Sequence, residues 1–221
     1  MDEIVCLTIG EIGTNCYLFS YSNCLCVVDP ANGSQKLIDT INEVCQRQNL
    51  HFESVFLTHG HLDHLAGITK LKQNFPEIKI YISKNDSKCL GEGSYRFQYD
   101  DFARAGMGFF VQHLLPDGKD LPAADVLVED GELLFNSEWK VISTPGHTKG
   151  SVCLYNENRR FLFTGDTLMF YAYGRTDLFG GNDLEMVESL QKLRSLDEDI
   201  VVYPGHDFSP FKLGQSYVWR M

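Results

Sequence analysis

The hydrophobic pattern of the N-terminal half predicts a sheet that is interrupted by helices. Short runs of apolar, β-branched and aromatic residues, bounded by Gly or Pro, predict strands at residues 4–9, 16–20, 25–29, 54–58 and 79–83. Between them, apolar residues recur at helical spacing, which predicts amphipathic helices over about 35–48 and 65–75. The half therefore begins with strands and then alternates helix, strand, helix and strand.

The C-terminal half repeats this order. Strands are predicted at residues 132–135, 139–143, 151–155, 160–164 and 200–202. A helix begins at Asn182, a suitable N-cap with Glu185 three residues later, and we expect Leu184, Val187, Leu190 and Leu193 to face inward. Two such halves predict an α/β (α+β) fold, a four-layer αββα sandwich of two mixed sheets with helices outside. We expect one domain over residues 1–221.

Residues 86–126 lose this regular pattern. Glycines punctuate the stretch, which is also rich in aromatic residues. A long irregular insertion in a compact enzyme forms a lid, a substrate wall or an oligomer contact, and the sequence leaves these alternatives open.

Four of the predicted strands share one kind of ending. Each apolar run stops at a turn-forming residue, and a Gly and a His or Asp follow within a step or two, in residues 55–61, 141–147, 161–166 and 201–206. Loops at one edge of a sheet are where rigid scaffolds usually carry chemistry. Five of the seven histidines lie in or beside these loops, which indicates a metal site.

The densest motif is His59-Gly60-His61-Leu62-Asp63-His64. Imidazole suits zinc, iron and similar metals, and carboxylates complete or bridge such sites. Each later candidate is weak alone, but all occupy the same place relative to a strand. The resulting hypothesis is a pair of metal ions, with His59, His61 and His147 on the first, Asp63, His64 and His206 on the second, and Asp166 bridging them. His51 and His113 do not fit this scheme, and we expect them to be structural or exposed.

Charge and cysteine content limit the possible partners and the compartment. With 19 basic and 30 acidic residues, the net charge of −11 disfavours a nucleic-acid surface or an anionic membrane as partner. Seven scattered cysteines without a CxxC pair predict reduced thiols and a cytoplasmic protein. Met1-Asp2-Glu3 does not begin a targeting segment. The oligomeric state stays open.

The motifs together resemble those of metallo-β-lactamase-fold hydrolases, and most of all the glyoxalase II-like (hydroxyacylglutathione hydrolase-like) branch. Besides the ligand motif, the supporting stretches are residues 13–17, 144–148, 164–167 and 174–177. Only a tail follows His206, so the expectation is a small thioesterase that lacks the C-terminal glutathione-binding helical domain.

The resemblance implies a metal-dependent hydrolase that cleaves thioesters of the S-lactoylglutathione type through a metal-bridging hydroxide. Two divalent ions are expected, zinc before iron or manganese, with Asp63 and Asp166 as catalytic carboxylates. The substrate would be a small anionic acyl-thiol, bound by Arg175 and Tyr173. Arg175 could instead form an ion pair with Asp177, Tyr173 could be a packed aromatic residue, and Thr58 and Thr148 could orient imidazoles. A single-iron persulfide dioxygenase, a lactonase and a non-catalytic metal-binding module are the alternatives.

Overall fold

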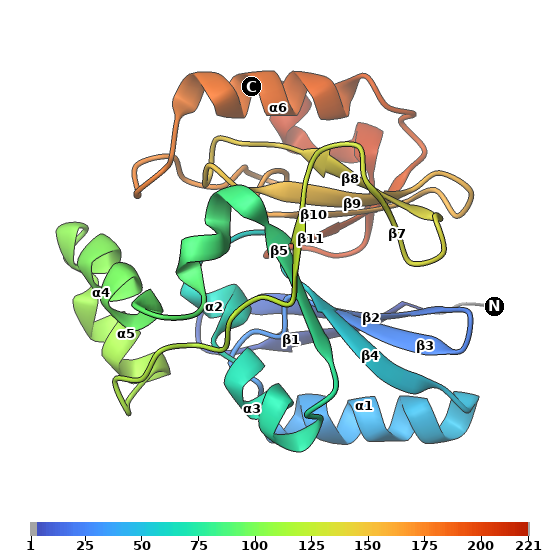
Figure 1. Ribbon diagram of the computed structural model, residues 1–221. Helices are drawn as coiled ribbons and strands as arrows, with labels where there is room; N and C mark the ends of the chain where they lie inside the picture. Colours follow the sequence, from blue (N-terminus) through green and yellow to red (C-terminus); the bar gives the residue numbers. More distant parts are fainter. Residues whose placement is uncertain (1–3, 221) are drawn as a thin grey trace. The chain divides into compact units, whose positions relative to one another are not determined.

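The computed structural model describes residues 4–220, so Met1–Glu3, where a targeting segment is not expected, lie outside the described residues (Figure 1). The chain forms two compact units. The first contains the chain up to Ile82 together with Ser87–Leu127, and the second contains Ser83–Asp86 and the chain from Val128 onward. No helix within residues 4–220 is long and apolar enough to span a bilayer.

The first unit is built on a mixed sheet in the order β1-β2-β3-β4-β5-β6. Its strands are β1 Val5–Ile9, β2 Thr14–Tyr21, β3 Cys24–Val28, β4 His51–Phe56, β5 Lys79–Ser83 and β6 Val126–Val128. β1, β2 and β3 pair antiparallel, whereas β3, β4 and β5 pair parallel. Parallel pairing brings the carboxyl ends of β3 and β4 to one edge, so Asp29 and His59, which follow these strands, lie close together.

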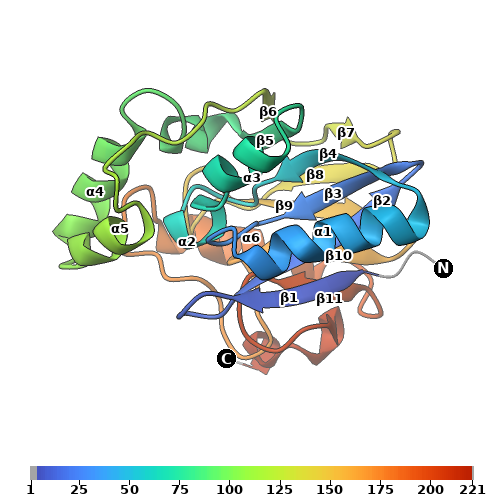
Figure 2. The same cartoon turned by 90° about the horizontal axis from the view of Figure 1, so that it is seen from below.

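Helices provide the crossovers between the parallel strands and cover one face of this sheet (Figures 1 and 2). α1 (Gln35–Gln48) is capped by Ser34, whose side chain accepts from the backbone N–H of Leu37, and it buries its predicted apolar stripe. The second predicted helix is divided at Gly67 into α2 (Leu62–Leu65) and α3 (Ile68–Asn74). A Cβ on Gly67 would lie 2.3 Å from the backbone nitrogen of Gly33, so only glycine allows this close approach.

The prediction that residues 86–126 are irregular is wrong. This segment contains most of a 3-10 helix (Lys84–Cys89), α4 (Ser94–Arg104) and α5 (Gly108–Leu114). Gly93 precedes α4 with φ of +79° and Gly106 follows it with φ of +75°. These glycines, which suggested a loop, instead mark the ends of helices that are too short to show a clear apolar period.

The second unit carries the other mixed sheet, in the order β12-β11-β10-β9-β8-β7. Its strands are β7 Leu133–Leu134, β8 Trp139–Ser143, β9 Val152–Asn156, β10 Phe161–Gly165, β11 Val201–Pro204 and β12 Phe211–Lys212. Among these described strands, only β10 and β11 pair parallel. Two short 3-10 helices, Leu213–Gln215 and Tyr217–Arg220, follow the last strand.

The crossover between β10 and β11 is α6 (Asp183–Arg194). Asn182 caps it as predicted, since its side chain accepts from the backbone N–H groups of Leu184 and Glu185. The predicted inward face is wrong in part: Leu190 and Leu193 are buried, but Leu184 is 76% exposed and Val187 is 51% exposed. Met186 and Ser189 take their places in the interior.

Candidate metal centre

The first unit holds four of the seven predicted ligands: His59 and His61 lie in the turn after β4, and Asp63 and His64 lie in α2. His59, His61 and His64 are buried, and the ring centroid of His59 lies 4.9 Å from that of His61 and 4.2 Å from that of His64. Asp63 lies in the first turn of α2. The clustering predicted for this motif is therefore present within a single unit.

Asp29 lies behind these histidines and accepts three hydrogen bonds. Its Oδ1 accepts from the backbone N–H of Thr58 at 2.8 Å. Its Oδ2 accepts from the Thr58 hydroxyl at 2.7 Å and from Nδ1 of His64 at 3.0 Å. All three side chains are buried. The carboxylate therefore serves to orient the histidine loop, although Asp29, His59 and His64 also lie close enough to form a metal-binding group.

These hydrogen bonds determine which imidazole nitrogen carries the proton. A carboxylate can only accept, so Nδ1 of His64 is the donor, and in the neutral imidazole Nε2 keeps the lone pair. The Thr58 hydroxyl gives its proton to Asp29, so it accepts from Nδ1 of His59, 3.0 Å away. Both histidines consequently present Nε2, the form in which imidazole binds a metal. The predicted role of Thr58 in orienting an imidazole agrees with this geometry.

Asp63 faces the Nε2 of His64. Its Oδ2 lies 3.2 Å from that nitrogen and also accepts a hydrogen bond from the Thr14 hydroxyl at 3.1 Å. Two lone pairs that face each other repel, and a divalent cation placed between them converts the repulsion into two ligand bonds. The donor set of the first unit therefore fits a metal ion.

The second unit brings together the other three predicted ligands, each after the strand that the sequence indicated. His147 follows β8, Asp166 follows β10 and His206 follows β11. Oδ2 of Asp166 lies 3.4 Å from Nε2 of His147 and 3.6 Å from Nε2 of His206. Neighbouring ligands of a tetrahedral zinc ion are about 3.3 Å apart when the Zn–N bonds are about 2.0–2.1 Å. The spacing therefore fits a carboxylate oxygen shared between two metal-binding imidazoles.

The loop after Asp166 orients His147. Nδ1 of His147 donates to the backbone carbonyl of Arg175 at 2.7 Å, which leaves Nε2 for a metal. Gly174 allows this approach, because a Cβ there would lie 2.4 Å from the carbonyl oxygen of Asp166 and 2.6 Å from Nδ1 of His147. The backbone N–H of Gly174 also donates to that carbonyl of Asp166.

The two predicted substrate-binding residues belong to the same loop. The Arg175 guanidinium binds Asp177 through two bonds, from Nε at 2.7 Å and Nη2 at 2.8 Å, and it lowers the pKa of that carboxyl to about 2. The ion-pair interpretation of Arg175 thus agrees with the structure. Tyr173 is 45% exposed. Contact of either residue with a substrate stays a prediction.

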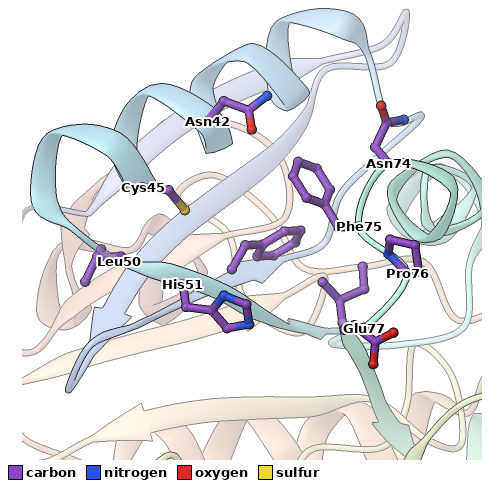
Figure 3. Close-up of a pocket in the computed structure, with 10 residues that line it drawn as sticks. Asn42, Cys45, Leu50, His51, Asn74, Phe75, Pro76 and Glu77 are labelled. Atoms are coloured by element: carbon purple, nitrogen blue, oxygen red, sulfur yellow. The ribbon is translucent and has the colours of Figure 1, made fainter.

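Three other residues considered in the sequence are not among these ligands. His51 and His113 are exposed, as expected. His51 begins β4 and lines a cavity of about 370 Å³ (Figure 3). His59 follows the other end of that strand. The hydroxyl of Thr148 bonds Asp86 and Ser151, so the prediction that it orients an imidazole finds no support in these bonds.

Asp29 is the functional residue that the sequence reasoning missed. The sequence predicts it only as the last residue of a strand over residues 25–29. The signal was present, because Asp29-Pro30 follows an apolar run at the same edge as the histidine loop. Nothing local distinguishes it from a turn residue, since its partners lie 29 and 35 positions later in the chain.

Comparison with known proteins decides the family. The model of the metallo-beta-lactamase superfamily matches residues 9–206, a span that includes all seven predicted ligands. The chain belongs to the metallo-β-lactamase superfamily. Its sheet order and helical crossovers agree with that membership, so the predicted fold class is confirmed.

Relatives within the superfamily include hydroxyacylglutathione hydrolases. GloC of Haemophilus influenzae is 33% identical over 181 residues, which cover 81% of this chain and 78% of that enzyme. The hydroxyacylglutathione hydrolase of Pectobacterium atrosepticum is 31% identical over 87% of this chain, but the match spans only 61% of that enzyme's length. Among solved structures, TTHA1623 in a di-iron-bound form is similar with a TM-score of 0.73 and 26% identity, over 96% of each chain.

Proposed function

We propose that this superfamily member is a metal-dependent hydrolase of acyl-thiols, with two divalent ions bound by His59, His61, Asp63, His64, His147, Asp166 and His206. The observation that carries the proposal is the position of Asp166 Oδ2, within 3.6 Å of two imidazole Nε2 atoms. A carboxylate oxygen in that position suits a bridging ligand. A solved relative that is described as di-iron-bound supports two ions rather than one.

The chain's own residues would prepare the site for the ions. Asp29 binds Nδ1 of His64, Thr58 binds Nδ1 of His59, and the Arg175 carbonyl binds Nδ1 of His147, so Nε2 of each ring is left to coordinate a metal. Because Nδ1 of each ring takes part in a hydrogen bond, the neutral imidazole carries its lone pair on Nε2, and a metal would bind there without a change of tautomer. When bound, such ions polarise a carbonyl and lower the pKa of water from 15.7 towards about 7.

The proposed reaction is hydrolysis of a thioester. Water adds its oxygen to the acyl carbon, the carbon–sulfur bond breaks, and the products are a carboxylic acid and a thiol. Asp63 and Asp166 are the proposed catalytic carboxylates, because Asp63 lies beside Nε2 of His64 and Asp166 lies beside Nε2 of His147. The names of the Haemophilus and Pectobacterium relatives support a hydroxyacyl-thiol substrate.

We propose that Arg175 and Tyr173 contact the anionic thiol portion of this substrate. Both lie on the exposed loop that follows Asp166, and the Arg175 side chain is 45% exposed. Two divalent ions bound by two carboxylates leave a net positive charge at the site, which favours binding of an anionic substrate. The proposed compartment is the cytoplasm, and the absence of any disulfide among the seven cysteines supports it.

The test joins metal analysis to thiol release. The purified protein should hold about two metal ions per chain and release free thiol from S-lactoylglutathione or a simpler acyl-thiol. A chelator should abolish turnover, and zinc, iron or manganese, tested separately, should restore it. His51→Gln is the matched control, because this exposed histidine lies at the far end of β4.

Two results would contradict the proposal. A protein that holds two metals but cleaves none of the acyl-thiols would refute the hydrolase function. One iron per chain, with oxygen consumed in the presence of a persulfide, would instead support the dioxygenase alternative.

A further inference from the structure

A cavity of about 240 Å³ opens beside Asp63 within the first unit. The end of β1 and the turn after it form one wall through Ile9 and Ile12, and α5 forms the other through Phe110 and Leu114. Asp63 itself lines the cavity. The cavity therefore begins at a proposed metal ligand and extends along the insertion that the sequence left unassigned.

The two walls present apolar side chains to each other. Phe110 and Leu114 are one helical turn apart on α5, so they lie on the same face of the helix. On the opposite wall Ile9 is buried, whereas Ile12 is 52% exposed at the turn. Such an arrangement favours a ligand that covers Ile12 with apolar surface.

The walls are connected to the histidine loop. The ring of Phe102, on α4, packs edge-on against His61, with 5.8 Å between the ring centroids. The ring of Phe110 packs against Phe102, with 5.7 Å between their centroids. Gln98, also on α4, donates to the carbonyl of Gly60 at 2.7 Å. The insertion thus holds the histidine loop and supplies the cavity wall, which favours the substrate-wall interpretation over a detached lid.

The charges at the rim select against an anion in this cavity. Oε1 of Glu11 lies 3.7 Å from Nε2 of His113, and both side chains are exposed. The described lining contains no Lys or Arg. A carboxylate at the end of a ligand chain would meet the charge of Glu11 without a lysine or arginine to balance it.

We propose that this cavity binds the acyl chain of the substrate and selects neutral, linear chains of roughly four to eight carbons. At about 30 Å³ for each water-sized group, a cavity of about 240 Å³ holds roughly eight such groups. The inference rests on the proposed function, because Asp63, a proposed metal ligand beside which the thioester carbonyl would bind, lines the cavity. It predicts that a small polar acyl group such as lactoyl leaves most of the cavity unfilled and is a poorer substrate than hexanoyl.

The experiment compares acetyl, butyryl, hexanoyl and octanoyl thioesters of one thiol on the metal-loaded enzyme. We expect kcat/KM to rise about fourfold per added methylene until the cavity is filled, the equivalent of ~0.8 kcal/mol for each buried methylene. Glutaryl, with a terminal carboxylate, should be cleaved at least tenfold more slowly than a neutral chain of equal length.

Two variants of α5 distinguish this cavity from the rest of the surface. Leu114→Trp reduces the free volume, so it should lower kcat/KM for hexanoyl about tenfold while acetyl is little affected. Phe109→Ala is the matched control, because Phe109 is 70% exposed on the same helix and does not line the cavity. It should leave the whole chain-length profile unchanged.

A binding measurement separates failure of this inference from failure of the proposed function. Alkyl thioethers of the same thiol cannot be hydrolysed, and calorimetry should show tighter binding with increasing chain length in the wild type but not in Leu114→Trp. If thioesters are cleaved but chain length has no effect, the cavity proposal is overturned and the hydrolase stands. If no thioester is cleaved, the hydrolase fails, and the thioether series still supports or overturns the apolar cavity.

Discussion

Asp29 and His64 are joined by a hydrogen bond of 3.0 Å between carboxylate Oδ2 and imidazole Nδ1, and both side chains are buried. The bond connects the carboxyl end of β3 to the start of α2. It determines the tautomer of His64 directly and that of His59 through the Thr58 hydroxyl. One buried carboxylate thus prepares two proposed metal ligands.

Replacing Asp29 should weaken metal binding without removing a ligand. An asparagine at this position would present an amide in place of the carboxylate, so Asp29→Asn should lower the metal affinity about 10–100-fold. Competition with a chromogenic chelator measures this affinity. Asp39→Asn, at an exposed position of α1, is the control. Equal affinities for the two variants would show that Asp29 does not orient the ligands.

A methyl group at position 174 should disturb two ligands together. A Cβ added to Gly174 would lie 2.4 Å from the carbonyl oxygen of Asp166 and 2.6 Å from His147 Nδ1. Overpacking of this kind costs ~1–3 kcal/mol, so Gly174→Ala should lower both the melting temperature and the metal affinity. Gly108→Ala is the comparison, since its nearest neighbours are side-chain atoms 3.3 Å away. The prediction fails if both alanine variants bind metal equally well.

Substitution of the histidines should show which of them bind metal. His61→Gln removes a buried imidazole of the histidine loop, and we expect the bound metal per chain to fall by about one ion after dialysis. His113→Gln, at an exposed position, should retain the wild-type content. Elemental analysis of both variants decides the matter, and equal metal contents would remove His61 from the ligand set.

Loss of the Asp166 carboxylate should affect the chemistry more than the fold. Asp166→Asn removes the charge shared between His147 and His206, and we expect kcat for thioester hydrolysis to fall by about 10³-fold or more. Asp197→Asn, which changes an exposed carboxylate in the same unit, should keep normal turnover. Retention of more than a tenth of the wild-type kcat by Asp166→Asn would contradict the proposed bridging role.

A hydrogen bond from a buried tyrosine should make the free energy of unfolding depend on pH in the acidic range. The Tyr21 hydroxyl donates to Glu53 at 2.6 Å and lowers the pKa of that carboxyl below its ordinary value of 4.5. Because the folded-state pKa is depressed, the contribution to stability is present above about pH 4.5 and is lost as the pH falls through the folded value.

Tyr21→Phe should therefore lower the free energy of unfolding by about 1–2 kcal/mol at pH 7, and the difference from wild type should narrow below about pH 4. Urea titrations of chelator-treated protein at several pH values measure this. Tyr155→Phe, at a half-buried position of the other unit, is the control. A gap that stays constant down to about pH 3 would contradict the coupling.

The sequence by itself predicted ten of the twelve described strands and the N-cap of α6, and it supplied the hypothesis of seven metal ligands. These features depend on neighbours in the chain: apolar runs define strands, and each proposed ligand follows a strand or begins a helix within a few residues. The capping residue Asn182 and the motif at residues 59–64 could be recognised from local chemistry for the same reason.

Only the tertiary structure decided which groups support those ligands. Asp29 meets Thr58 and His64 because β3 and β4 pair in parallel, a relationship across 29 and 35 residues that local periodicity does not contain. The inward face of α6 and the cavity wall on α5 likewise depend on packing against distant segments of the chain. Local sequence specifies an element and its chemistry, whereas the partner of a buried polar or apolar group depends on which elements the fold brings together.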